Sequence, residues 1–394
     1  MKHLGRFGLA AALLVSLAAI KHISGVRAAG GPVEFSNESY RVLAPIESGN
    51  LLLFPVVRVN GKSPGATPFL TLDEGIKNGQ VEVTEAGKVQ GLIRPREGTS
   101  YFAQDRNRGD QVNTLVLVNN SDQPLLLLAG EIVTGGKQDR VIAKDRIVPS
   151  GGDPIDLSVF CIEPGRWTES SAKFGATART PAEGFMVQPT VREKAMATKN
   201  QQEVWSAVGG TIAQMEVAAA PPVSNGLPAA QPLSTTSYAK AMQDSSVSKK
   251  VDEEMAPVMK SRDQVLATLR QEHAVGVVVA VRGEIVWADL FANTELLARY
   301  WTKLVRSYAA ESLSGGETHA HATVADAQRF LDAPAEGSET SEGDVGVYRY
   351  SELKSGGTET FVLESLLPEA SYEVHISKLK LRGAFRRPAP AVYR

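Results

Sequence analysis

Cysteine is almost absent from this chain, with Cys161 the only one among 394 residues. A single thiol excludes an internal disulfide and any zinc site built from paired cysteines, so packing must stabilise the fold. Neither sign of charge is in large excess, because 42 Lys and Arg residues stand against 44 Asp and Glu residues. Binding to nucleic acid needs clustered cations, so we expect no nucleic-acid partner.

Long apolar runs are also scarce, and the main one lies near the N-terminus. It reads LAAALLVSLAAI from Leu9 to Ile20, after basic residues and before a stretch that ends in small ones. Crossing a bilayer takes about 20 apolar residues, so the run indicates a secretory signal peptide. We expect cleavage after Ala28 or Ala29 and a secreted or periplasmic protein without a membrane anchor. An uncleaved anchor is the alternative, because Lys21 departs from the signal pattern.

The mature chain would be mildly acidic and large enough for a sizeable core. Removing residues 1–28 takes away four basic side chains and no acidic one, which changes the formal net charge from −2 to −6. With 43% hydrophobic residues, the remainder can form one large core or two modest ones. Single cores stop growing at roughly 250 to 300 residues.

Short apolar stretches between turn formers predict β-structure over residues 34–167. Within it, NTLVLVNNSDQPLLLLAGEIV at 113–133 predicts a hairpin with a polar turn at 119–122. The fold class is therefore α+β, with an N-terminal, mostly antiparallel β domain followed by helices, a β-hairpin and a long amphipathic helix.

Helical patterns follow at 192–210, which ends at a glycine pair, and at 238–273, which is interrupted near Pro257. The next stretch, 274–291, predicts a hairpin that turns at Arg282-Gly283, and an amphipathic helix starts at Asn293. These patterns give the expected organisation: signal peptide 1–28, main domain 34–310 with a β-rich part 34–167 and an α+β part 168–310, Pro-rich loop 218–237, C-terminal extension with short strands 311–380, and disordered tail 381–394.

Polar residues gather in two glycine-containing turns, LAGEIVTGGKQDR and CIEPGRW. The first turn is not a phosphate loop, because Glu131 stands where that motif needs its first glycine. Arginine binds phosphate or carboxylate in a bidentate way, and tryptophan stacks on rings. We predict a shared ligand recess with contacts from Lys137, Gln138, Asp139, Arg140, Arg166 and Trp167. The alternative is that Asp139 and Arg140 pair with Arg166 and Glu163 only to fix the loops.

Catalysis has three candidate residues, and none belongs to a complete motif. Cys161 is a possible nucleophile, although its alternation with Leu157 and Val159 is typical of a small buried residue. Glu131 and Glu163 are the candidate general bases. The pair His319 and His321 has no further ligand motif beside it, so we predict no metal and no cofactor.

The two turns, the helix around Trp205 and VGVVVAVRGEIVWADLFANTELLARYWTKLVRSYAAES together resemble a bacterial and archaeal family. It is the ADP-ribosylglycohydrolase- and rhodanese-phosphatase-associated protein domain, and the resemblance covers about residues 42–310. The resemblance implies no defined reaction and at most a role near NAD-derived or ADP-ribose chemistry. The Pro-rich insertion and the part beyond residue 310 depart from the family pattern.

Three functions fit the sequence. The first is an exported, non-catalytic domain that binds a small anionic or nucleotide-like ligand, or an envelope protein, at the two turns. On this hypothesis Arg140→Ala and Arg166→Ala abolish binding and change stability by no more than about 1 kcal/mol. The second is a hydrolase or transferase that uses Cys161, Glu131 or Glu163. The third is a structural envelope protein.

Overall fold

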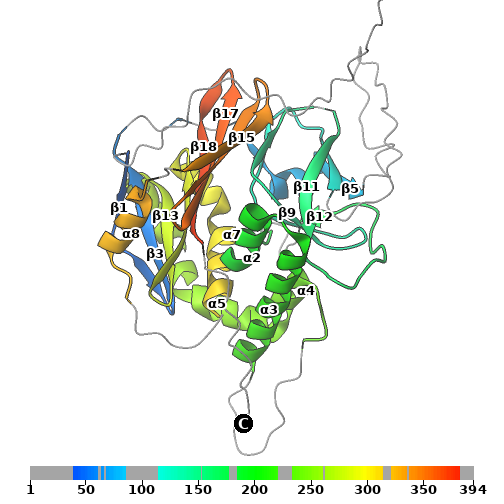
Figure 1. The fold of residues 1–394 in the computed structure, drawn as a ribbon, viewed down its shortest axis with the longest axis horizontal. Coiled ribbons are helices and arrows are strands. Elements are labelled where there is room, and N and C mark those ends of the chain that lie inside the picture. The colour runs from blue at the N-terminus through cyan, green and yellow to red at the C-terminus, as the bar shows by residue number, and fades with distance from the viewer. Residues whose placement is uncertain are drawn as a thin grey trace, which may run out of the picture.

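The structure is a computed structural model. It describes the residues 39–60, 64–65, 68–85, 114–151, 153–176, 184–220, 233–260, 262–313, 321–334 and 337–381. The predicted signal peptide, most of the Pro-rich loop and the tail beyond Leu381 lie outside the described residues. The fold is α+β, with antiparallel sheets at the N-terminal end of the chain, as the sequence predicted (Figure 1).

The largest sheet combines strands from both ends of the chain. Its order is β1-β3-β13-β14-β18-β17-β16-β15, with β2 also paired to β3, and all neighbours are antiparallel. The strands are β1 Tyr40–Val42, β2 Ile46–Ser48, β3 Leu51–Arg58, β13 Ala274–Val281, β14 Glu284–Phe291, β15 Ser338–Asp344, β16 Tyr348–Ser355, β17 Thr358–Leu367 and β18 Ala370–Lys380.

Four strands within 338–380, part of the segment 311–380 that the sequence set apart as an extension, complete this sheet. Strand β18 pairs with β14, so that Leu290 lies opposite Ile376. Strands β15 to β18 follow one another as a meander of 7 to 11 residues per strand. The C-terminal strands therefore share a hydrogen-bonded sheet with β3 and β13.

Two smaller sheets are formed by residues 70–176. One has the order β10-β7-β4, and the other has the order β12-β8-β9-β11-β6-β5. Their strands are β4 Leu70–Thr71, β5 Val81–Glu85, β6 Thr114–Asn119, β7 Leu125–Leu127, β8 Ile132–Thr134, β9 Arg140–Ile142, β10 Arg146–Val148, β11 Ile155–Cys161 and β12 Gly175–Ala176.

The hairpin predicted at 113–133 is wrong, because its two strands belong to different sheets. Strand β6 pairs with β5 and β11, whereas β7 pairs with β4 and β10. Asn119 holds the connection between β6 and β7 in place, because its Nδ2 donates to the carbonyls of Gln123 at 2.9 Å and Pro149 at 3.0 Å. The polar turn thus directs the chain into a second sheet.

The helices are α1 Leu72–Lys77, α2 Pro189–Glu193, a π-helical turn η3 Lys194–Thr198, α3 Gln201–Ala219, α4 Tyr238–Gln243, α5 Ser245–Lys260, α6 Arg262–Gln271, α7 Thr294–Ser312 and α8 Val324–Asp332. Two expected helix ends differ from the observed ones. Helix α3 continues through Gly209 and Gly210, and α5 contains Pro257. Packing explains both differences. Val208 and Ile212 of α3 and Val258 of α5 are buried in the core, and this burial offsets the unfavourable free energy of glycine and proline within a helix.

The predicted hairpin and the amphipathic helix after it are confirmed. Strands β13 and β14 turn at Arg282 and Gly283, whose φ angles of 51° and 76° suit a tight two-residue turn. Asn293 caps α7 by accepting a hydrogen bond from the Leu296 N–H. The expected stop at Gly315 lies outside the described residues.

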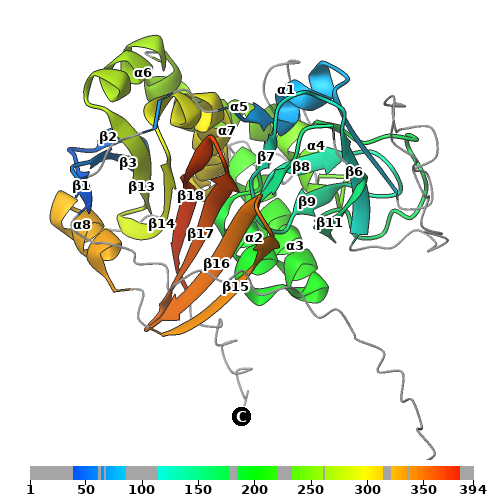
Figure 2. The same cartoon turned by 90° about the horizontal axis from the view of Figure 1, so that it is seen from above.

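Helix α7 lies at the centre of the molecule (Figures 1 and 2). One core cluster joins α7 to the large sheet, to α2, α3 and α5, and to the small sheets. A second core cluster packs α8 against the opposite face of the large sheet. Within the described part of the chain, no helix combines the length and apolar character needed to cross a bilayer.

Candidate functional site

The two glycine-containing turns meet in space. Strands β9 and β11 are antiparallel neighbours with Arg140 opposite Cys161, so the turn before β9 lies beside the loop after β11. The Ile162 N–H donates to the Asp139 carbonyl at 3.0 Å, and the Asp139 N–H donates to Glu163 Oε2 at 3.1 Å. Side chains separated by more than 20 positions along the chain are thereby brought together at one end of the sheet.

Arg166 connects the two turns. Its guanidinium lies 2.5 Å from Glu163 Oε2 and 3.5 Å from Asp139 Oδ1, and it donates to the Gly136 carbonyl at 3.0 Å. Arg166 also donates to the Thr168 carbonyl at 2.8 Å. The pairing of Arg166 with Asp139 and Glu163 therefore agrees with the alternative in which these charges fix the loops.

The tight turn before β9 depends on two glycines. Gly135 and Gly136 have φ angles of 126° and 49°, in the region that side chains other than glycine rarely adopt. A Cβ atom on Gly136 would also come within 2.2 Å of the Phe174 ring. These glycines let the backbone turn closely enough for its carbonyls to reach Arg166.

The two carboxylates of this junction are buried, and their pKa values move in opposite directions. Burial opposes ionisation of Glu163, but hydrogen bonds from Arg166 and Lys240 outweigh it and lower its pKa. Burial raises the pKa of Asp139, and the hydrogen bond from Ser237 Oγ at 2.7 Å offsets only part of this effect. The junction thus contains one firmly ionised carboxylate and one that is easier to protonate.

Arg140 and Gln138 face the protein interior. Arg140 is fully buried, with its guanidinium 3.9 Å from Glu85 Oε1 and 2.6 Å from the Gln138 carbonyl. Gln138 Nε2 donates to the Glu163 carbonyl at 3.2 Å. Among the residues predicted to contact a ligand, Gln138, Asp139 and Arg140 are therefore held inside the fold.

Glu131 lies in a different cluster. It is fully buried and accepts hydrogen bonds from Lys303 of α7 at 2.6 Å and from the Leu128 N–H at 2.8 Å. Lys303 is also 2.5 Å from Asp73 of α1. Burial raises the pKa of Glu131 in spite of Lys303. Glu131 thus joins α7 to the small sheets and does not line the junction of the two turns.

The Cys161 thiol is buried behind this junction. Gln201 of α3 holds its backbone on both sides, accepting from the Cys161 N–H and donating to its carbonyl, each at 2.9 Å. The sulfur accepts the Glu163 N–H at 3.4 Å. Burial raises the pKa of the thiol, although the Trp205 side chain opposes that shift. A shielded thiol with a raised pKa has little thiolate for nucleophilic attack.

The solvent-facing part of the site is formed by other side chains. Trp167 is 46% exposed, and Lys137 Nζ lies 5.1 Å from the centre of its ring. Lys240 of α4 is also exposed, with Nζ 3.0 Å from Glu163 Oε1. Lys240 and Arg166 therefore flank the same carboxylate, one on each oxygen.

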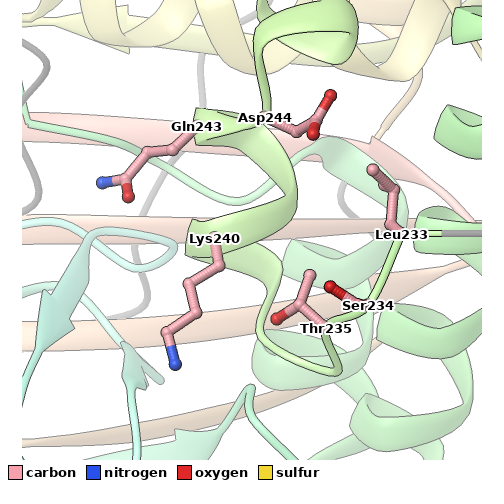
Figure 3. A pocket seen from close by; sticks show the side chains of 6 residues that line it. All are labelled: Leu233, Ser234, Thr235, Lys240, Gln243 and Asp244. Atoms are coloured by element: carbon pink, nitrogen blue, oxygen red, sulfur yellow. The ribbon is translucent and has the colours of Figure 1, made fainter.

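A hollow of about 340 Å³ lies beside Lys240 (Figure 3). Its lining residues are Leu233, Ser234, Thr235, Lys240, Gln243 and Asp244. Thr236 and Ser237 attach this segment to the two turns, through the Pro164 carbonyl at 2.5 Å and Asp139 Oδ2 at 2.7 Å. Sequence reasoning missed these residues, because the polar stretch before α4 has the composition of a loop and lies more than 60 positions after Trp167.

Sequence reasoning also missed a buried ionic cluster around His375. His375 lies 2.6 Å from Asp145 and 3.2 Å from Asp289. Arg192 donates to Asp289 at 2.8 Å, and the Tyr308 hydroxyl donates to the same carboxylate. These residues come from α2, α7, β14, β18 and the β9–β10 connection, and no sequence motif relates them.

The electrostatics of this cluster favour the ionised form of Asp289 and the protonated form of His375. Burial opposes ionisation of Asp289, but Arg192 holds its pKa well below the usual value. Burial also opposes the charged form of His375, but Asp145 outweighs it and the pKa rises to about 9. At neutral pH His375 is therefore a cation. The cluster is fully enclosed and offers no surface to a ligand.

Metal-ligating groups do not converge in the described part of the chain. No set of three or more His, Cys, Asp or Glu side chains there has an arrangement that could hold a metal ion. His319 lies outside the described residues. His321 precedes α8, whose N-cap Thr323 forms a capping box with Asp326.

Comparisons with known proteins identify a family. No curated protein and no solved structure matched the chain. A family model, the ARG and Rhodanese-Phosphatase-superfamily-associated Protein domain, matches residues 39–379. The match contains both glycine turns, α7 and the C-terminal strands β15 to β18, so it extends well beyond the expected limit at residue 310. The chain belongs to the ARG and Rhodanese-Phosphatase-superfamily-associated Protein domain family.

Proposed function

We propose that this protein is an exported, non-catalytic binding domain for a small nucleotide-like ligand that carries an aromatic ring and an anionic group. The observation that carries the proposal is the exposed indole of Trp167, with Lys137 Nζ 5.1 Å from its ring centre. An exposed indole offers a stacking surface, and stacking on an aromatic side chain contributes about 1 to 3 kcal/mol per base. Lys137 and Lys240 supply positive charge for the anionic group.

The alternative of a hydrolase or transferase that uses Cys161, Glu131 or Glu163 has less support from the geometry. Cys161 is buried, and burial raises the pKa of its thiol. Glu163 is held between Arg166 and Lys240, which lower its pKa, whereas a general base works best with a pKa near the operating pH. Glu131 is enclosed with Lys303. Each candidate catalytic group is thus used within the fold.

Binding of AMP to the full chain, measured by calorimetric titration, tests the proposal. Trp167→Ala should weaken AMP binding at least tenfold, which corresponds to the loss of about 1.4 kcal/mol of stacking. Gln214→Ala, an exposed change on α3, is the matched control and should leave the affinity unchanged. Equal affinity of the Trp167→Ala protein and the wild type, or no AMP binding at all, would exclude this ligand surface.

Export is the second part of the proposal, and its support is the N-terminal sequence alone. The basic start, the apolar run and the small residues at the expected cleavage point, Ala28 to Gly30, are typical of a cleaved signal peptide. Cell fractionation followed by N-terminal sequencing tests it. A mature protein starting at Ala29 or Gly30 supports export, whereas an intact Met1 in the soluble cytosolic fraction refutes it.

A further inference from the structure

The hollow beside α4 places an ammonium and a carboxylate at its two ends. Lys240 and Asp244 are four positions apart, and the Asp244 N–H still donates to the Lys240 carbonyl at 3.1 Å, as in a helix. Residues with this spacing lie on one helix face with Cβ atoms roughly 6 Å apart. Figure 3 shows the two side chains extending in opposite directions from this turn, with Ser234 and Thr235 on the facing segment and Gln243 directed away from that segment.

The two charges do not neutralise each other, because each has a partner elsewhere. Lys240 Nζ lies 3.0 Å from Glu163 Oε1, on the side of the two glycine turns. Asp244 Oδ1 caps α5 by accepting from the N–H groups of Ser246 at 2.9 Å and Val247 at 3.3 Å. Asp244 Oδ2 remains as an acceptor that no hydrogen bond occupies in the described part of the chain.

The backbone that forms the hollow is held rigidly. Ser237 and Thr236 are bonded to Asp139 and Pro164, as described above, and the Tyr238 N–H donates to the Ile162 carbonyl at 3.1 Å. On the other side, the Leu233 N–H donates to Glu216 of α3 at 2.9 Å. A site built on fixed backbone loses little conformational entropy when it binds. By contrast, the Ser234 hydroxyl makes no hydrogen bond within the described residues.

We propose that this hollow is the subsite for the sugar-phosphate part of the nucleotide-like ligand, with Lys240 at the phosphate and Asp244 at the vicinal hydroxyls. This inference rests on the proposed function, and it assigns the sugar-phosphate part of the ligand to the hollow beside α4. A carboxylate accepts hydrogen bonds from adjacent hydroxyls, as acidic side chains do at ribose, and an ammonium binds phosphate as a point charge. A volume of about 340 Å³ suits one sugar unit.

Comparison of AMP with 2′,3′-dideoxy-AMP tests the hydroxyl contact. The wild-type chain should bind AMP at least about fivefold more tightly, because the dideoxy compound lacks the donors for Asp244. Asp244→Asn should reduce this preference to about onefold, since an amide is a poorer acceptor, and asparagine still caps α5. Glu253→Gln, nine positions further along α5, removes one exposed carboxylate elsewhere and should preserve the preference.

The phosphate contact has its own variant. Lys240→Met should lower the affinity for AMP and the affinity for dideoxy-AMP by the same factor, about fivefold or more. The affinity for adenosine, which has no phosphate, should stay unchanged. A wild-type chain that shows no preference for the hydroxyls, or a preference that persists in Asp244→Asn, overturns the subsite. If either result is found and Trp167→Ala still lowers the affinity for AMP, the proposed function stands without the subsite. No AMP binding by the wild type refutes both.

Discussion

His375 Nδ1 lies 2.6 Å from Asp145 Oδ2, across 230 positions of the chain. His375 belongs to β18 of the large sheet, and Asp145 precedes β10 of the small sheets. Asp145 Oδ1 also accepts the Ala129 N–H at 2.7 Å, in the first glycine-containing turn. This fully buried pair therefore ties the family's first polar turn to the C-terminal strands.

The charge on His375 predicts a pH dependence of stability. Its pKa rises from 6.5 to about 9 in the fold, so its contribution is fully present below pH 6.5 and is lost as pH rises to about 9. The full contribution is on the order of 3 kcal/mol. Urea unfolding of the wild type and of His375→Gln should therefore show a large difference at pH 6 that shrinks by pH 9. An equal difference at all pH values would contradict a charged His375.

Lys378, three positions further along β18, titrates in the opposite sense and serves as the control. Burial lowers its pKa from 10.5 to about 8, so its cost to the folded state disappears as pH rises from 8 to 10.5. Lys378→Met should remove this rise in stability and leave the change between pH 6.5 and pH 8 intact. Unfolding curves at half-unit pH steps separate the two residues.

Arg192 should be among the residues most sensitive to substitution. It pairs with Asp289 at 2.8 Å with both side chains buried, and its guanidinium lies 4.6 Å from the centre of the Trp287 ring. Arg192→Met removes the guanidinium that lies 2.8 Å from the buried Asp289 carboxylate and should cost about 3 to 5 kcal/mol of unfolding free energy. Arg329→Met, which removes an exposed arginine paired with Asp326, should cost less than about 1 kcal/mol. Chemical denaturation measures the loss of unfolding free energy in each variant. Similar losses in Arg192→Met and Arg329→Met would show that the buried Arg192–Asp289 pair does not stabilise the fold more than an exposed pair.

Arg166 should behave as a structural residue and Trp167 as a surface residue. Arg166→Ala removes the cation that lies between Glu163 and Asp139, so we expect a loss of about 2 to 3 kcal/mol. This replaces the expectation from sequence that stability would change by no more than about 1 kcal/mol. Trp167→Ala should cost less than about 0.5 kcal/mol, because the side chain is exposed. Thermal unfolding of both variants measures the two losses. Equal stability of the two variants would argue against a role of Arg166 in connecting the two glycine-containing turns.

Cys161 should resist thiol reagents in the native state. The side chain is buried, and its raised pKa further lowers the thiolate fraction at neutral pH. Alkylation should be at least about 100-fold faster in denaturant than in the native protein. The chain has no other cysteine, so the mass increase reports this site alone. Rapid alkylation of the folded protein would restore Cys161 as a candidate nucleophile.

Local patterns in the sequence determined several parts of this protein. The class of the fold, the β13–β14 turn at Arg282-Gly283, the start of α7 at Asn293 and the buried position of Cys161 all depend on neighbouring residues. Backbone conformation, capping and strand alternation act within a few positions, and a sequence displays them directly. The family resemblance came from the same local stretches.

Only the tertiary structure decided which strands share a sheet and which polar groups meet. The run at 113–133 has the composition of a hairpin, yet β6 pairs with β5 and β11, and β7 pairs with β4 and β10. The apolar residues of both strands enter one core cluster with those partners. Arg140 and Arg166 look equivalent in the sequence, but one faces Glu85 in the interior and the other joins the two turns. Partners such as Asp145 and His375 are selected by the packing of distant elements around α7, and that packing energy is not encoded by any short stretch of residues.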